Sequence, residues 1–242
     1  MLKYDSIAEL VEAAKKQKMK ISEMVLADQA ATAEADPETL YARMERSFDV
    51  MCEAVESGSA KDQVSMSGLT GGEGYHMFDY AKRTGGGLCG SFMTGAMARA
   101  LSVAGCNASM GRIVASPTAG SCGILPGCLV SLYKEGRAEK RDIVMSMFTS
   151  GAFGMVIAKN ASIAGATGGC QAEFGTASAM AAGALVALRG GSGEQIGHAV
   201  AMALKNLMGL ICDPVAGLVE VPCVKRNVIG AVNAVSVADM AM

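Results

Sequence analysis

The chain has 242 residues and a formal net charge of −2, and it is 51 % apolar with 30 Gly and 18 Met but no Trp. Positive and negative residues are mixed along it, which gives no electrostatic reason to expect nucleic acid or a membrane as a partner, so small-molecule chemistry is the better expectation. Because only 5 % of the residues are aromatic, the core must consist of Ala, Met, Val and Leu with close backbone contacts. This composition favours packed helices.

The first quarter of the chain, about residues 1–60, predicts amphipathic surface helices. Ser6 followed by Glu9 has the pattern of a capping box. The segment 36–38 supplies a cap, a first-turn proline and an acidic first turn for a periodic segment that ends near Gly58. The N-terminus lacks the uninterrupted apolar segment of a signal peptide, so we expect a cytoplasmic protein.

After Asp62 the sequence predicts apolar helices separated by glycine-rich loops. The alternating pattern of β-strands is nearly absent. The glycine-rich turns are expected at 69–72, 84–87 and 116–120, and the helices between them at about 90–104, 121–134 and 141–158.

The most apolar helix is expected at 174–188, because a helix without charged residues on any side must be enclosed by other helices. Ser192 and Gln195 form a second capping-box pattern, which opens a helix that continues to about Leu210. The segment 227–242 is also helical in its periodicity and has no stop signal, so we expect either a chain truncated inside a helix or a disordered tail.

These patterns predict an all-α fold, with residues 1–242 as a single helical domain. Its outer layer consists of the amphipathic helices at about 1–60. Its core, at about 62–242, contains apolar central helices and Gly-rich interhelical loops and is expected to hold the functional site.

Three of the eight cysteines lie where a plain helix interior is disfavoured. Cys170 follows two glycines, Cys212 precedes an Asp-Pro pair and Cys223 follows a proline, so all three belong on loops or helix ends and can converge. Their separations of 42 and 11 residues are too wide for a zinc ribbon or an electron-carrying ferredoxin. Three thiolates would leave one iron of a four-iron cluster open, which suits catalysis. On spacing alone, ordinary buried cysteines remain an open alternative.

Three segments of the sequence closely resemble the signatures of the iron-sulfur-dependent L-serine dehydratase alpha subunit: SPTAGS at 116–121, GATGGCQAE at 165–173 and CDPVAGLVEVPC at 212–223. The resemblance runs from about Leu69 to Asn227. It implies an all-helical catalytic domain and a 4Fe-4S cluster ligated by Cys170, Cys212 and Cys223. It also implies a beta subunit or domain that this chain lacks. The sequence stops short of the family's usual C-terminus.

The same resemblance implies dehydration and deamination of L-serine to pyruvate and ammonia, with an open iron acting as Lewis acid on the hydroxyl group. Pyridoxal phosphate is not expected, because no lysine has a convincing pyridoxal-binding context. The expected partners are L-serine and the beta subunit in an oligomer, without nucleic acid or membrane. Two alternatives stay open: an iron-sulfur cysteine desulfidase, and a non-catalytic iron-sulfur carrier or sensor.

Substrate contacts are expected from turns rich in glycine and hydroxyl groups, where small residues let backbone N–H groups form an anion-binding concavity. The candidates are Thr70, Gly71, Ser116, Thr118, Ser121 and Asn160. Plain helix connection is the alternative for the turns, and capping of a backbone group is the alternative for Asn160. The general base is expected on the beta subunit or among four weaker candidates: His76, Lys82, Lys159 and Glu173.

Overall fold

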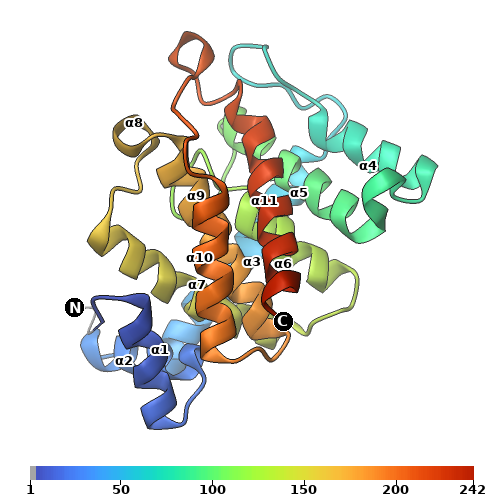
Figure 1. The fold of residues 1–242 in the computed structure, drawn as a ribbon. Coiled ribbons are helices and arrows are strands. Elements are labelled where there is room, and N and C mark those ends of the chain that lie inside the picture. Colours follow the sequence, from blue (N-terminus) through green and yellow to red (C-terminus); the bar gives the residue numbers. More distant parts are fainter. Residues whose placement is uncertain (1–3) are drawn as a thin grey trace.

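A computed structural model describes residues 4–242, and within that range the protein contains helices and no strand (Figure 1). The all-α prediction is confirmed. The α-helices cover Ile7–Gln17 (α1), Ile21–Thr32 (α2), Pro37–Gly58 (α3), Glu73–Thr84 (α4), Gly90–Ala108 (α5), Ile124–Lys134 (α6), Lys140–Asn160 (α7), Gly165–Gly168 (α8), Cys170–Leu188 (α9), Gly193–Asn206 (α10) and Cys223–Ala241 (α11). Short 3-10 helices occupy Gly87–Cys89 (η1) and Val215–Gly217 (η2).

Two predicted helix starts are made by the expected caps. The Ser6 hydroxyl accepts a hydrogen bond from the Glu9 backbone N–H at 3.1 Å, and Ser192 accepts from the Gln195 N–H at 3.2 Å. Helix α3 begins at Pro37 directly after its cap residue. Each device satisfies or removes an N–H group that the first helical turn leaves unpaired, which fixes where the helix begins.

Helix α9 lies at the centre of the molecule and packs against α6, α7, α10 and α11. Residues 174–186 are buried without interruption, which agrees with the prediction of an enclosed helix. In Figure 1, α10 and α11 lie side by side across the front of the bundle. The N-terminal helices cover the outside, with α1 against α10, α2 against α7, and α3 against α5.

Close backbone approach adds to the packing of a core that has few aromatic side chains. A Cβ atom added at Gly58 of α3 would lie 1.7 Å from the Ser102 carbonyl oxygen of α5. At Gly127 of α6 it would lie 3.0 Å from the Ala96 carbonyl oxygen of the same helix α5. Helices α3 and α6 therefore contact α5 almost backbone to backbone, which only glycine permits at Gly58.

Helix α7 is the one helix in residues 4–242 with the length and composition of a membrane span, at a mean hydropathy of 1.2. However, 67 % of its most apolar window is buried inside the protein. Its packing against α9 and α2 accounts for its apolar composition, as in the core helix of many soluble proteins.

The helix ends that matter for the site gather at one end of the bundle. Helices α9 and α11 both begin there, and the segments 59–72 and 207–222 form loops at that same end, at the top of Figure 1. The C-terminus lies at the opposite end, as the bottom of the figure shows. Antiparallel packing of α10 between α9 and α11 produces this arrangement, because α10 returns the chain to the end where α9 began.

Candidate functional site

The three cysteines singled out by the sequence lie at this loop-bearing end. Cys170 is the first residue of α9 and Cys223 the first of α11, and both are buried; Cys212 is exposed in the loop between α10 and α11. The prediction that these thiols occupy loops or helix ends is confirmed. Thiolates at Cys170 and Cys223 would face the positive ends of two helices of 19 residues each, which favours the charged form.

Hydrogen bonds hold the start of the Cys212 loop over the start of α9. The Gln171 backbone N–H donates to the Leu210 carbonyl at 2.8 Å, and the Gln171 side-chain oxygen accepts from the Gly209 N–H at 2.8 Å. Arg226 of α11 donates to the Cys170 Sγ at 3.1 Å and to the Ile211 carbonyl at 3.2 Å. One guanidinium therefore connects α9, α11 and the segment that carries Cys212.

The three thiols influence one another electrostatically. Burial is the main cause that raises the pKa of Cys223 to about 11; the Cys170 thiol, Glu173 and the Cys212 thiol act in the same direction, and Arg226 acts against them. Burial also raises the pKa of Cys170, while the hydrogen bond from Arg226 lowers it. Without a cation the Cys170 and Cys223 thiols stay protonated, and a bound metal would stabilise their thiolates.

Among residues 4–242, no three His, Cys, Asp or Glu side chains are close enough to hold a single metal ion. A four-iron cluster, being larger than one ion, is held by sulfurs that stand farther apart. Soft thiolates are its usual ligands, and here they come with two helix N-termini and a neighbouring arginine. The chemistry of this donor set fits an iron-sulfur cluster.

The segment 116–121 lies beside these helix starts. Thr118 Oγ1 donates a very short hydrogen bond to the Glu173 carboxylate of α9, and Thr118 Oγ1 lies 3.0 Å from Ser121 Oγ. Glu173 is enclosed by glycines, because a Cβ atom at Gly120 or Gly165 would come within 2.5 or 2.6 Å of its carboxylate oxygens. The buried Ser116 hydroxyl has no hydrogen-bond partner in the described part of the chain. The turn therefore offers one unused donor beside a half-buried carboxylate.

Asn227, which is fully buried in α11, connects this turn to Cys223. Its Oδ1 accepts from the Gly123 N–H at 2.8 Å, and its Nδ2 donates to the carbonyls of Gly120 at 2.9 Å and Cys223 at 3.0 Å. All three of its polar contacts are therefore with backbone groups of the two site segments.

Replacement of Asn227 by Asp is expected to lower the free energy of unfolding by about 3 kcal/mol or more, because a buried carboxylate oxygen would face two carbonyl oxygens. Asn233→Asp on the same helix is the matched control. Asn233 is only partly buried and donates to one hydroxyl and one carbonyl, so water can solvate the new charge. Urea unfolding of both variants measures the difference, and equal losses would contradict this role of Asn227.

The turn that carries Thr70 and Gly71 is fastened to the loop that leads into Cys223. The Ser65 and Ser67 hydroxyls both donate to the Glu220 carboxylate at 2.6 Å. Thr70 is buried near this carboxylate, but its hydroxyl makes no hydrogen bond of normal geometry. A Cβ atom at Gly71 would lie 2.6 Å from the Gln63 carbonyl oxygen, so the turn requires glycine there.

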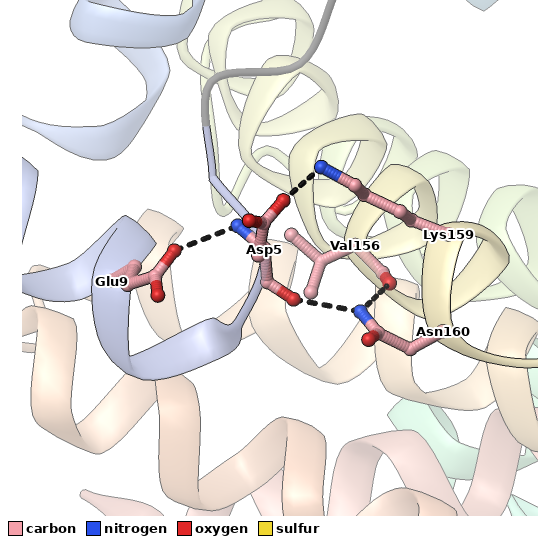
Figure 2. A network of polar contacts seen from close by, with 5 residues as sticks. All are labelled: Asp5, Glu9, Val156, Lys159 and Asn160. Atoms are coloured by element: carbon pink, nitrogen blue, oxygen red, sulfur yellow. Dashed lines mark hydrogen bonds and ion pairs between the residues drawn. The ribbon is translucent and has the colours of Figure 1, made fainter.

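Two of the predicted residues engage the N-terminal segment instead of the cysteines. Figure 2 shows that Asn160 Nδ2 donates to the carbonyls of Asp5 at 2.7 Å and Val156 at 2.9 Å, while Lys159 pairs with the Asp5 carboxylate. Asn160 thus caps backbone groups, the alternative interpretation of this residue. His76 and Lys82 lie exposed on α4, and of the four candidate bases Glu173 is the one that electrostatically affects Cys170 and Cys223.

Three residues of the site were not predicted from the sequence: Arg226, Asn227 and Glu220. Asn227 carried a signal, since it follows Cys223 by four residues on a helix and such residues share a face. Glu220 lies in the segment 212–223, but no motif assigned it a role. No sequence pattern indicated that Arg226 contacts a cysteine 56 positions away.

The family described as serine dehydratase alpha chain matches residues 16–242. The chain belongs to the serine dehydratase alpha chain family. The match includes all three cysteines and the turns around them.

Two relatives of this serine dehydratase alpha chain are similar over nearly its whole length. It is 44 % identical over 239 residues to a probable L-serine dehydratase, alpha chain, of Bacillus subtilis, which covers 99 % of this chain and 79 % of that protein. It is 39 % identical over 234 residues to the L-serine dehydratase, alpha chain, of Peptoniphilus asaccharolyticus, covering 97 % and 80 %. The L-serine dehydratase TdcG of Escherichia coli is 47 % identical over 144 residues, which are 59 % of this chain and 32 % of TdcG.

Proposed function

We propose that this chain carries the catalytic site of an L-serine dehydratase, which converts L-serine to pyruvate and ammonia. The observation that carries the proposal is that segments 116–121, 165–173 and 212–223 meet at one end of the bundle, with thiols, one unused hydroxyl and a carboxylate side by side. Family membership supplies the reaction class. A cytoplasmic location accompanies the proposal.

Cys170, Cys212 and Cys223 are the proposed ligands of a 4Fe-4S cluster. When bound, the cluster would supply a Lewis acid for the substrate hydroxyl through an iron that no cysteine ligates. The chain's own contribution is to bring two buried thiols and one exposed thiol together. Arg226 offsets part of their negative charge when they ionise.

The substrate carboxylate is proposed to bind the hydroxyl-rich turns. Ser116 offers a buried hydroxyl without a partner, and Thr118 and Ser121 present two more beside it. The N-termini of α9 and α11 make this end of the bundle favourable for an anion. Thr70 and Gly71 contribute from the facing turn that Glu220 holds.

Glu173 is the proposed acceptor of the substrate Cα proton. Its carboxylate keeps one fixed hydrogen bond from Thr118 and is half-buried at the start of α9. General bases gain efficiency when such a bond fixes their orientation within reach of the proton. Loss of the Cα proton and of the hydroxyl group from serine gives aminoacrylate, which tautomerises and hydrolyses to pyruvate and ammonia.

A second, beta chain is proposed to cover this end of the molecule. The alpha-chain naming of the family indicates an enzyme of more than one kind of chain. Several apolar side chains are exposed on the loops beside the cysteines, with Met66 74 % and Ile211 66 % exposed. Exposed apolar groups gathered near a functional site are typical of an interaction surface.

The test is an anaerobic reconstitution followed by three measurements: iron and sulfide content, pyruvate release from L-serine, and pyruvate release from L-cysteine, each with and without the partner chain. We expect four irons per chain and faster turnover of serine than of cysteine. Preference for cysteine would make the chain a desulfidase. A stable, reducible cluster without turnover of either amino acid would make it an iron-sulfur carrier or sensor.

A further inference from the structure

Glu220 is a buried carboxylate at an unexpected place, within the loop between the two ligand cysteines of the C-terminal half. It is 5 % exposed and lies three residues before Cys223. Its oxygens accept hydrogen bonds from the Ser65 hydroxyl at 2.6 Å, the Ser67 hydroxyl at 2.6 Å and the Ser67 N–H at 3.4 Å. In residues 4–242 no lysine, arginine or histidine forms an ion pair with it.

The two serines that bind Glu220 also shape the turn that carries Thr70 and Gly71. The Ser65 N–H donates to the Thr70 carbonyl at 2.9 Å, and the Ser65 hydroxyl accepts from the Thr70 N–H at 3.3 Å. The Ser67 hydroxyl accepts from the Leu69 N–H at 3.1 Å. Each serine hydroxyl can accept from the turn only while its own hydrogen points elsewhere, and that hydrogen points at Glu220.

Ionised Glu220 is therefore the common acceptor at the end of both hydrogen-bond chains. The hydrogen bond from Ser65 and, to a smaller extent, that from Ser67 hold the pKa of the Glu220 carboxyl below its usual range. At neutral pH the group is therefore ionised, and it accepts hydrogen bonds but donates none. The turn is anchored on its other side to α5, where the Met66 N–H donates to the Ala108 carbonyl at 3.0 Å. Glu220 fixes the side of the turn that faces the cysteines.

We propose that Glu220 is a positioning residue that couples the turn at residues 65–71 to the cysteine loop and thereby sets the affinity for the substrate carboxylate. This inference rests on the proposed function. Glu220 does not touch the substrate. It orients Ser65 and Ser67, which in turn place the unpaired hydroxyl of Thr70 and the backbone of Gly71.

The test compares Glu220→Gln with the control Glu9→Gln. Glu9 lies in α1, distant in sequence from the turn, and its carboxylate accepts a hydrogen bond from the Asp5 backbone N–H at 2.8 Å. Amide hydrogen exchange of the cluster-free protein reports the turn directly. We expect the Ser65, Leu69 and Thr70 amides to exchange at least tenfold faster in Glu220→Gln and unchanged in Glu9→Gln. In the reconstituted enzyme with its partner chain, the KM for serine should rise about tenfold at unchanged iron content and similar kcat.

Unchanged exchange in the turn of Glu220→Gln overturns the coupling, whatever the chain catalyses. Faster exchange with an unchanged KM, or a loss of activity that follows a loss of iron, shows that Glu220 supports only the cysteine loop and overturns the role in substrate affinity. If Glu220→Gln does not fold, Ser67→Ala decides, since it removes one donor and leaves the carboxylate in place. If the wild-type chain shows slow amide exchange in the turn but no turnover of serine, the proposed function is wrong, whereas the coupling between Glu220 and the turn is still supported.

Discussion

Replacement of Cys170, Cys212 or Cys223 by serine is expected to abolish both cluster occupancy and turnover of serine. A hydroxyl stays protonated at neutral pH and is a hard ligand, whereas a thiolate is soft and suits iron in a cluster. Activity should fall at least a thousandfold, because the Lewis acid is lost altogether. Iron content and visible absorbance of each anaerobically reconstituted variant measure the loss of the cluster.

The same exchange at Cys52, Cys106 and Cys128 provides the matched controls. Cys106 and Cys128 are 2 % and 0 % exposed in the core, and Cys52 is half-buried against it. Burial raises the pKa of Cys128 to about 12, as expected of a structural thiol. A buried serine hydroxyl costs about 1–3 kcal/mol of stability if it finds no partner, but the cluster should remain. A folded control variant without iron, or a triad variant with a full cluster and activity, would identify other ligands.

Glu173→Gln is expected to lower kcat for serine about a hundredfold or more at unchanged iron content. The amide oxygen can still accept the hydrogen bond from Thr118, so the local structure persists while the proton acceptor is lost. Initial rates of pyruvate formation at saturating serine, normalised to bound iron, measure the effect.

Lys159→Gln is the control for this substitution, because Lys159 was a candidate base and pairs with Asp5 at the surface. It should retain the wild-type kcat. If Glu173→Gln keeps most of its activity while Lys159→Gln does not, the proton acceptor has been misassigned; if neither variant loses activity, the base comes from the partner chain.

Much of the helical framework could be predicted because its signals are local. Helix α3 was expected to begin at Pro37, after a cap at Asp36, and to end near Gly58, and it spans Pro37–Gly58. Helix α10 was expected to reach Leu210 but ends at Asn206, since the 207–211 segment instead bonds to the start of α9. Helix α4 was not predicted, because its glycine-rich flanks outweighed the acidic first turn and basic last turn that favour it.

The site could be predicted only as a set of segments. Loop positions of the three cysteines followed from neighbouring Gly and Pro residues, which is local chemistry. The contacts of Arg226 with Cys170 and of Glu220 with Ser65 join residues 56 and 155 positions apart, and no periodicity or motif specifies such pairs. The role of Asn160 was ambiguous for the same reason, since its partner Asp5 lies just before α1, 155 positions away in the sequence.

The backbone-to-backbone contacts of α5 bear on how the protein can be altered by engineering. Where α3 and α6 cross α5 there is no side chain at Gly58 or Gly127 to trim or rotate, because the helix backbones themselves are in contact. A larger residue there would have to displace an entire helix, and overpacking of this kind is destabilising. Libraries aimed at accepting a different amino acid should therefore vary the exposed positions around Cys212 and the turn at 65–71, and leave the helical interior unaltered.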